Sequence, residues 1–401
     1  MHILVDENIP QGREVFGAYG TVTTFHGRKL TAEDVKAANA DALLVRSITK
    51  VGAALLDGSN VKFVGTATIG VDHIDQAYLK ERNIGFSAAP GCNARSVAEY
   101  FVAALLHLHV KNGLALEGKT LGIVGHGNVG KQVAAIAPAL GLNVLVSDPP
   151  LQDSGATPPP GGFHTLHDLA ARCDLITFHT PLTKTGPHPT LRMADAAFFA
   201  ALAASGKHIT LMNMGRGEAF DEPAVIDAVD RGVVKHLVLD VFPGEPDVNP
   251  ELARRADLIS PHIAGYSIQG KLNGTTQIHD AFCAHFGIGG LAKKSGVDYP
   301  KPVAPVIDVA ALDPAARHPE ASPETTLHHI VRHAYDIARD DADLRAFLGP
   351  DYNKADFSTS FDGLRKRYPV RQEFAGFTVR GLPAEKKIVN EKLTRLGFSV
   401  E

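Results

Sequence analysis

Three ionisable residues follow short apolar runs that are typical of buried β-strands. Arg216, Glu245 and His262 each come after one of three successive runs of this kind. Ligands of open parallel sheets bind beyond the carboxyl ends of the strands, so we expect these side chains near a ligand. A histidine, whose ordinary pKa is about 6.5, can take a proton from a hydroxyl group. A carboxylate can orient its ring, and the planar fork of an arginine suits a carboxylate ligand.

This combination favours the removal of hydride from a secondary alcohol that also carries a carboxylate. Each residue alone allows a plainer interpretation. The arginine can be a surface residue at a helix N-terminus, and one histidine among 19 is commonly structural or merely exposed. Because the three residues stand at neighbouring strand ends, we prefer the catalytic interpretation.

A glycine-rich motif indicates where a dinucleotide would bind. The spacing GxGxxG follows the apolar run 121–124 and precedes a helical pattern over 131–140. The first glycine permits a tight turn, the second lets the backbone approach a pyrophosphate, and the third permits close packing of helix on strand. The helix N-terminus favours the phosphate charge. The motif consists of Gly125, His126, Gly127, Asn128, Val129 and Gly130.

An acidic residue completes this motif. Asp148 follows the next apolar run, 144–147, and comes 18 residues after Gly130. A carboxylate at that strand end can accept hydrogen bonds from both ribose hydroxyls of NAD, whereas it repels the 2′-phosphate of NADP. The sequence therefore predicts NAD as the cofactor. The alternative is a structural glycine turn beside a solvated aspartate.

Short apolar runs alternate with helix-length segments over the first 286 residues, which predicts βαβ units and parallel sheets. A first series of strands is expected at 3–5, 42–45, 62–65 and 84–86, with helices at 32–38 and 74–82. After a long helix at 94–111, a second series is expected at 120–124, 143–147, 174–178, 208–212, 236–239 and 258–260. A helix at 269–286 returns the chain towards the first series. The fold class is α/β, with two Rossmann-like parallel-sheet domains.

The C-terminal part has a different composition. Residues 287–305 are rich in Gly, Lys and Pro and are typical of a linker. Beyond them we expect helices at 326–339 and 387–396 and a strand at 374–379, which make a smaller α+β domain. The first helix has an apolar face that needs a partner surface, and a two-fold homodimer is the commonest solution. The alternative is a segment that folds back on its own subunit. The face consists of Leu327, Ile330, Val331 and Tyr335.

The predicted domains are therefore 1–93 with 267–289, 94–266, and 290–401. The 401 residues are 44% hydrophobic and 21% charged, which excludes wholesale disorder. Lys and Arg number 40 against 44 Asp and Glu, so we expect no nucleic-acid partner. The most apolar stretch, 97–110, is too short to span a bilayer. No close set of metal ligands appears and the three cysteines are widely spaced, so we expect a cytoplasmic enzyme without a metal.

Taken together, these motifs resemble the D-2-hydroxyacid dehydrogenase family. The resemblance implies that Arg216 binds the substrate carboxylate and polarises the C2 oxygen, that His262 is the general base, and that Glu245 holds it. Besides the glycine-rich loop and Asp148, the positions that match cofactor contacts are Thr180, Met214, Gly215, Asp240 and Gly265. One departure is the segment 213–215, Asn-Met-Gly, where the family usually has Asn-Ala-Cys or Asn-Thr-Ala.

A narrower resemblance is to a branch of this family that has a C-terminal dimerisation domain and oxidises a phosphorylated 2-hydroxy acid. It is carried by residues 45–49, 65–73, 90–94 and 360–369. It implies that Ser47, Thr68 and Tyr266 contact substrate. Candidate cations for the phosphate are Arg46 and Arg216. A cluster in the tail is a further candidate, since a dimer could bring it near a partner's site, although a charge run is more often a solvated face. That cluster is Arg365, Lys366, Arg367 and Arg371. Another 2-hydroxyacid dehydrogenase and a non-catalytic, NAD-sensing binding protein are the rival interpretations.

Overall fold

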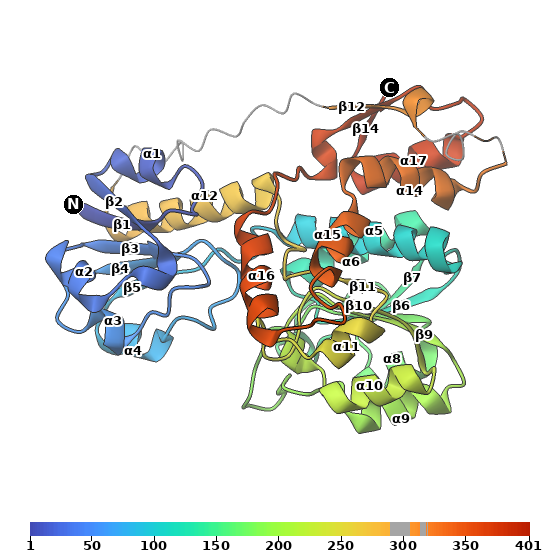
Figure 1. The fold of residues 1–401 in the computed structure, drawn as a ribbon, viewed down its shortest axis with the longest axis horizontal. Helices are drawn as coiled ribbons and strands as arrows, with labels where there is room; N and C mark the ends of the chain where they lie inside the picture. Colours follow the sequence, from blue (N-terminus) through green and yellow to red (C-terminus); the bar gives the residue numbers. More distant parts are fainter. Residues whose placement is uncertain (289–304, 313–317, 319) are drawn as a thin grey trace. The chain divides into compact units, whose positions relative to one another are not determined.

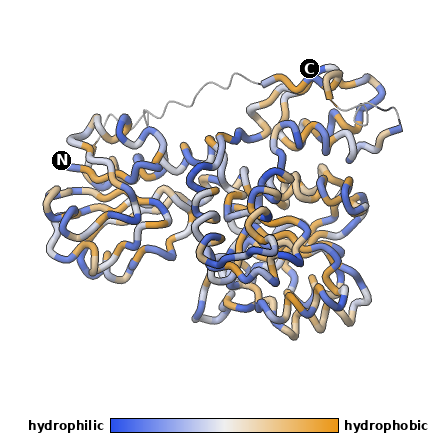
Figure 2. The backbone as a smooth tube through the Cα atoms, viewed as in Figure 1, coloured by the Kyte–Doolittle hydropathy of each residue, from blue (hydrophilic) through white to orange (hydrophobic). Residues whose placement is uncertain are grey.

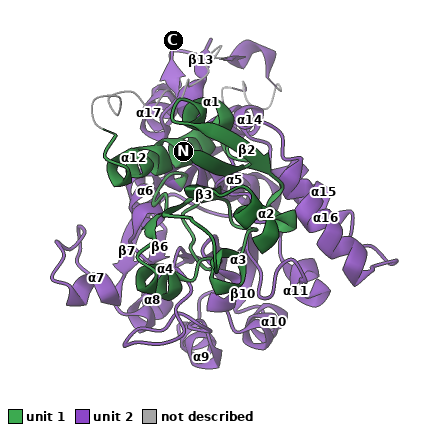
Figure 3. Ribbon diagram, turned by 90° about the vertical axis from the view of Figure 1, so that its left-hand side faces the viewer, with its two compact units in different colours: residues 1–93, 267–301 green, residues 94–266, 302–401 purple. Residues whose placement is uncertain are grey.

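The computed structural model describes residues 1–288, 305–312, 318 and 320–401. The chain divides into two compact units (Figure 3): unit 1 is Met1–Asn93 with Ser267–Lys301, and unit 2 is Ala94–Tyr266 with Pro302–Glu401. Most of the expected linker, 289–304, lies outside the described residues. Within the described part of the chain, no helix is both long and apolar enough to cross a membrane.

Unit 1 contains a five-stranded parallel sheet in the order β2-β1-β3-β4-β5 (Figure 1). Its strands are β1 (His2–Asp6), β2 (Thr21–Phe25), β3 (Ala42–Val45), β4 (Phe63–Thr66) and β5 (Gly85–Ser87). Its helices are α1 (Gly12–Gly17), α2 (Ala32–Ala37), α3 (Ala53–Leu56), α4 (Gln76–Glu81) and the long α12 (Ile268–His285). Strands β3 and β4 are fully buried, which explains their continuous apolar sequence.

Unit 2 is built on a six-stranded parallel sheet in the order β11-β10-β9-β8-β6-β7. Its strands are β6 (Thr120–Val124), β7 (Asn143–Ser147), β8 (Leu175–Phe178), β9 (Ile209–Asn213), β10 (Val234–Leu239) and β11 (Leu258–Ile259). Its helices up to residue 266 are α5 (Ala94–Asn112), α6 (Asn128–Ile136), α7 (Pro149–Asp153), α8 (Leu166–Arg172), α9 (Ala196–Ala204), α10 (Glu222–Asp230) and α11 (Pro250–Arg255). The strand order reverses at β6, and the hydrophobic colour in Figure 2 follows these strands. The predicted α/β class with two parallel sheets is confirmed.

The C-terminal part of unit 2 adds a small parallel sheet in the order β12-β13-β14. Its strands are β12 (Val306–Asp308), β13 (Thr378–Arg380) and β14 (Ser399–Val400). Its helices are α14 (Pro323–Ala334), α15 (Ile337–Arg345), α16 (Lys354–Lys366) and α17 (Lys387–Leu396).

Two expectations for this part are corrected. The helix expected at 326–339 is two helices, because Tyr335 is extended and Asp336 caps α15 by accepting a hydrogen bond from the backbone N–H of Ala338. The strand expected at 374–379 is confined to 378–380, because a 3₁₀ turn occupies Phe374–Gly376.

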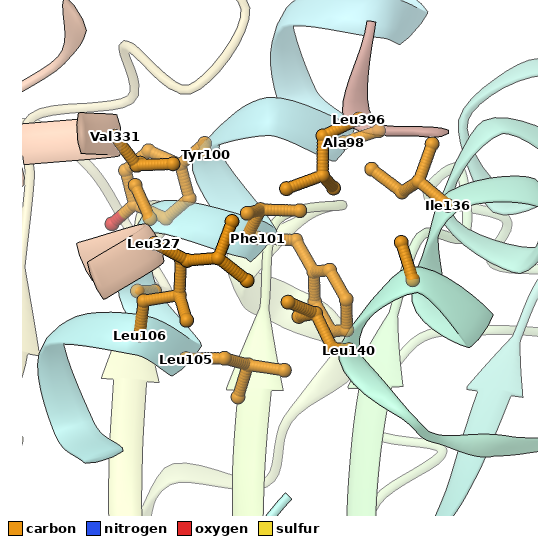
Figure 4. Packing of buried hydrophobic residues seen from close by; sticks show 14 of the residues in the cluster. Ala98, Tyr100, Phe101, Leu105, Leu106, Ile136, Leu140, Leu327, Val331 and Leu396 are labelled. Carbon is orange, nitrogen blue, oxygen red and sulfur yellow. The ribbon is translucent and has the colours of Figure 1, made fainter. Parts of the chain in front are cut away.

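Helix α5 forms the centre of the main core of unit 2. It is buried on nearly every side, as expected for a helix that is apolar all round. Figure 4 shows Leu327, Val331 and Leu396 from the C-terminal segment packed in the same cluster as Tyr100 and Phe101 of α5. The apolar face of α14 is therefore covered within its own chain. Because this face is already buried, it does not need a second subunit to cover it. Homodimerisation through the predicted domain 290–401 stays a prediction.

Candidate active site

The glycine-rich loop joins β6 to α6 and has the backbone that a dinucleotide site needs. Gly125 has a φ of 90°, a conformation that favours glycine. A Cβ on Gly130 would lie 2.0 Å from the carbonyl oxygen of Gly125, so the helix approaches the turn as closely as only glycine permits. A Cβ on Gly127, at the N-cap of α6, would meet open space. The loop therefore fits a pyrophosphate at the N-terminus of α6, where Asn128 and Val129 begin the helix.

Asp148 lies at the end of β7, beside the glycine-rich loop. One carboxylate oxygen accepts a hydrogen bond of 2.7 Å from the backbone N–H of His126, and the other caps α7 by accepting from Leu151 at 3.0 Å. These two bonds fix the carboxylate next to the loop. The position suits the predicted contact with ribose hydroxyls, because each carboxylate oxygen can accept more than one hydrogen bond.

Glu245 and His262 form a hydrogen-bonded pair. His262 Nδ1 contacts Glu245 Oε1, and the other oxygen of Glu245 accepts from the backbone N–H of Phe242 at 3.2 Å. His262 has a φ of 55°, an uncommon conformation for a residue other than glycine. Its backbone N–H donates to the carbonyl of Asp240 at 2.7 Å, which holds this conformation. With Nδ1 engaged, Nε2 is the nitrogen left to exchange a proton with a substrate.

The electrostatics keep Glu245 ionised. Burial by itself raises the pKa of Glu245, but the positive charge and hydrogen bond of His262 and the charge of Arg365 more than offset it. The net result is a pKa of Glu245 below its ordinary value. An ionised carboxylate on Nδ1 stabilises the imidazolium that forms when Nε2 accepts a proton.

Asp240 orders the turn that carries His262. The residue is buried, and its carboxylate accepts hydrogen bonds from the hydroxyl of Ser260 at 2.6 Å and from the backbone N–H groups of Ile263 at 2.8 Å and Ala264 at 3.1 Å. Burial raises the pKa of Asp240 more than the charge of His262 and these hydrogen bonds lower it. The geometry makes Asp240 a positioning residue for the turn, and its direct contact with a cofactor stays a prediction.

Arg216 follows β9 in a turn fixed by Asn213. The Asn213 side chain accepts from the backbone N–H of Gly215 and donates to the carbonyl of Arg216, each at 3.0 Å. A Cβ on Gly215 would lie 2.8 Å from the carbonyl oxygen of Thr180, so the turn approaches residue 180 closely. Met214 fills the main core of unit 2. In the Asn-Met-Gly segment, Met214 is therefore packed in the core and Gly215 lies close to residue 180, near the ends of β8 and β9.

The remaining predicted substrate contacts lie in different units. In unit 1, Ser47 is exposed two residues after β3, and Thr68 lies two residues after the neighbouring β4. The Thr68 hydroxyl accepts a hydrogen bond from the Thr66 hydroxyl at 2.7 Å and donates one to the carbonyl of Gly70 at 2.9 Å. In unit 2, Tyr266 follows Gly265 and packs edge-on against Tyr368, with 5.8 Å between ring centroids.

Sequence reasoning missed contacts from the C-terminal segment to the turn that carries His262. Arg371 donates to the carbonyls of Ala264 at 2.7 Å and Ser96 at 2.9 Å. Asp341 accepts from the backbone N–H of Ile259 at 2.8 Å. No periodic pattern marks these residues, because their contacts are with residues far away in the sequence. A buried arginine three residues before the predicted strand 374–379 is recognisable only once the fold is known.

The comparisons with known proteins define the class. A family model described as "D-isomer specific 2-hydroxyacid dehydrogenase, NAD binding domain" matches residues 104–264, and a domain of unknown function matches residues 306–397. A D-lactate dehydrogenase from Aquifex aeolicus, solved with NAD and lactic acid, superposes with a TM-score of 0.58 at 24% identity over 74% of this chain and 100% of its own. A glyoxylate reductase from Paecilomyes thermophila superposes with a TM-score of 0.57 at 23% identity, over 71% of this chain and 95% of its own. Together with the full-length relatives described next, the family model shows that the chain is an NAD-dependent oxidoreductase of the D-2-hydroxyacid dehydrogenase class.

Relatives over the whole chain define the family more narrowly. Erythronate-4-phosphate dehydrogenase of Edwardsiella ictaluri is 44% identical over 379 residues, which cover 94% of each chain. The enzyme of the same name from Citrobacter koseri is 42% identical over 399 residues, which cover 100% of this chain and 98% of its own. The chain belongs to the erythronate-4-phosphate dehydrogenase family.

Proposed function

We propose that this enzyme oxidises 4-phospho-D-erythronate to (R)-3-hydroxy-2-oxo-4-phosphooxybutanoate with NAD, as a step of pyridoxal 5′-phosphate (vitamin B6) biosynthesis. The observation that carries the proposal is the Glu245–His262 pair beyond the carboxyl ends of β10 and β11, on the sheet that also carries the glycine-rich loop. The names of the full-length relatives support the choice of substrate.

The residues of the chain divide the reaction between them. His262 Nε2 takes the proton of the C2 hydroxyl, while Glu245 on Nδ1 fixes the ring and stabilises the charge that develops. Arg216 binds the carboxylate and polarises the C2 oxygen, which becomes the carbonyl oxygen. NAD held by the glycine-rich loop and Asp148 would supply the acceptor for the hydride, which leaves C2 with the electron pair of the C–H bond. Ser47, Thr68 and Tyr266 contact the rest of the substrate.

We assign the cofactor site to the glycine-rich loop and Asp148, together with Thr180, Met214, Gly215, Asp240 and Gly265. Homodimerisation through the C-terminal part is proposed from the family resemblance alone, and light scattering of the full chain measures it. The cytoplasmic location likewise stays a prediction.

A substrate panel tests the proposed reaction. The purified protein is mixed with NAD and, separately, with 4-phosphoerythronate, 3-phosphoglycerate or D-lactate at equal concentration, and formation of NADH is followed through the first turnover. We expect NADH from 4-phosphoerythronate, with the other two slower by at least about 100-fold, since a site that pairs a polar substrate group rejects analogues that leave its own groups unpaired. Faster oxidation of 3-phosphoglycerate or D-lactate would assign another substrate. Tight NADH binding without oxidation of any of them would favour a sensing role.

A further inference from the structure

Helix α16 of the C-terminal segment lies along the turn that carries Glu245. The Ser358 hydroxyl donates to Asp247 at 2.5 Å, and the carbonyl oxygen of Pro246 lies 3.3 Å from the same hydroxyl. One turn further along the helix, the ring of Phe361 packs against Phe242, with 6.3 Å between centroids. These contacts anchor the helix against residues 242–247, on the C-terminal side of β10.

The other end of α16 leads to Tyr266. Tyr368, two residues past the helix, packs its ring edge-on against Tyr266, and its hydroxyl donates to Asp340 at 2.7 Å. Arg365 lies between the two anchor points, four residues after Phe361 and three before Tyr368. Residues four apart share a helix face, so Arg365 stands on the face that meets the Glu245 turn.

The surroundings of Arg365 leave part of its guanidinium group unused. Its closest ion pair is to Asp362, where Nη1 and Oδ1 are 3.7 Å apart, and its side chain is only 17% exposed. Its Nε atom is buried and has no hydrogen-bond partner among the described residues. Burial alone lowers the pKa of Arg365, but interactions with Tyr266, Glu245 and Asp362 raise it above its ordinary value. A buried donor without an acceptor is unfavourable and indicates a missing partner.

Of the neighbouring arginines, Arg371 also has one buried guanidinium nitrogen, Nη1, without a hydrogen-bond partner among the described residues. Arg371 is committed to two backbone carbonyls and stacks on Tyr335, with its guanidinium carbon 4.2 Å from the ring centroid. Arg367 is exposed. Within the described cluster 365–371, Arg365 is therefore the partly buried cation that has an unpartnered nitrogen and also interacts with Tyr266 and Glu245.

We propose that Arg365 binds the second anionic group of the substrate, the phosphate at the end remote from the C2 carboxylate. This inference rests on the proposed function, in which the substrate carries both groups. A guanidinium fork matches a phosphate in geometry as well as in charge. Glu245 and Asp362 are the acidic neighbours that oppose a phosphate, and the charge of Glu245 is balanced by His262 during the reaction. Tyr266, which we propose contacts the substrate, interacts with Arg365. The C-terminal segment then completes the active site of its own chain.

The test compares Arg365→Met and Arg365→Lys with Arg367→Met, an exposed arginine two residues away. Each full-length protein is assayed with 4-phosphoerythronate and with unphosphorylated D-erythronate. For Arg365→Met we expect kcat/KM on the phosphorylated substrate to fall by about 10- to 100-fold, mainly through KM, with little change for D-erythronate. Arg365→Lys should recover part of the loss, and Arg367→Met should behave as the unmodified enzyme.

Equal losses on both substrates, together with a shifted pH profile of kcat, would show that Arg365 acts only through Glu245 and would overturn the proposal. An unchanged ratio between the substrates would also overturn it. A second test needs no turnover: the binding of inorganic phosphate to the NADH-loaded protein is measured by calorimetry. We expect the unmodified protein to bind phosphate and the Arg365→Met protein to lose this binding. If the unmodified enzyme prefers another phosphorylated 2-hydroxy acid, the proposed function fails, and the same comparison with that acid and its unphosphorylated analogue still tests Arg365.

Discussion

We expect His262→Asn to lower kcat by about two to four orders of magnitude, the usual contribution of a positioned general base. Asparagine is the replacement of choice because His262 has a φ of 55°, and asparagine tolerates this conformation better than alanine does. The backbone hydrogen bond to Asp240 should therefore persist. Loss of activity then reports the missing imidazole and not a collapsed turn.

The control for this variant is NADH binding, which should stay within about twofold because the glycine-rich loop and Asp148 lie on other strands. Glu245→Gln keeps a hydrogen-bond acceptor for His262 Nδ1 but removes the charge, so it should lose activity by a smaller factor. Near-normal turnover in His262→Asn would remove this residue from the proton transfer.

The second large effect is expected for Arg371→Met, in stability. Arg371 is buried, donates to the carbonyls of Ser96 and Ala264, and stacks on Tyr335. Methionine keeps much of the apolar volume but leaves the two carbonyls without these donors. Charged hydrogen bonds contribute about 1.5–3 kcal/mol each, so we expect the free energy of unfolding to fall by about 3–5 kcal/mol. Urea unfolding of unit 2, followed by circular dichroism, measures the change.

Arg367→Met is the matched control, because it removes the same charge at an exposed position four residues away. It should change the free energy of unfolding by less than about 0.5 kcal/mol. Arg371→Met with the same urea midpoint as this control would mean that the C-terminal segment does not hold the turn at Ala264.

Much of the nucleotide-binding fold could be predicted from the sequence because buried parallel strands are continuously apolar. The runs before Gly125 and Asp148 are of this kind, and strands β6 and β7 form at these two runs. Strand β2 was missed because it is an edge strand rich in threonine and mostly exposed, so no apolar run marks it. The break at Tyr335 was missed because the apolar periodicity of α14 runs on through it, whereas tertiary packing buries the ring.

Only part of the candidate site could be predicted from the sequence. Strand-end positions bring Glu245 and His262 together because the carboxyl ends of β10 and β11 are neighbours. The role of Asp240 in ordering the turn and the approach of α16 to Glu245 depend on long-range contacts, for which sequence spacing carries no signal. For the same reason the apolar face of α14 could not be assigned to a second subunit or to the same chain until α5 was seen to cover it.

The most direct test of the central claim is a single turnover with 4-phospho-D-erythronate deuterated at C2. The full-length protein is mixed with NAD and the labelled acid, the reaction is stopped, and the nicotinamide product is analysed by mass spectrometry. If C2 gives up hydride to NAD while His262 takes the hydroxyl proton, the reduced cofactor carries one deuterium per turnover, and the His262→Asn protein forms it at least about 100-fold more slowly. Reduced cofactor without deuterium, or none with this acid while another 2-hydroxy acid is oxidised, would contradict the proposed reaction.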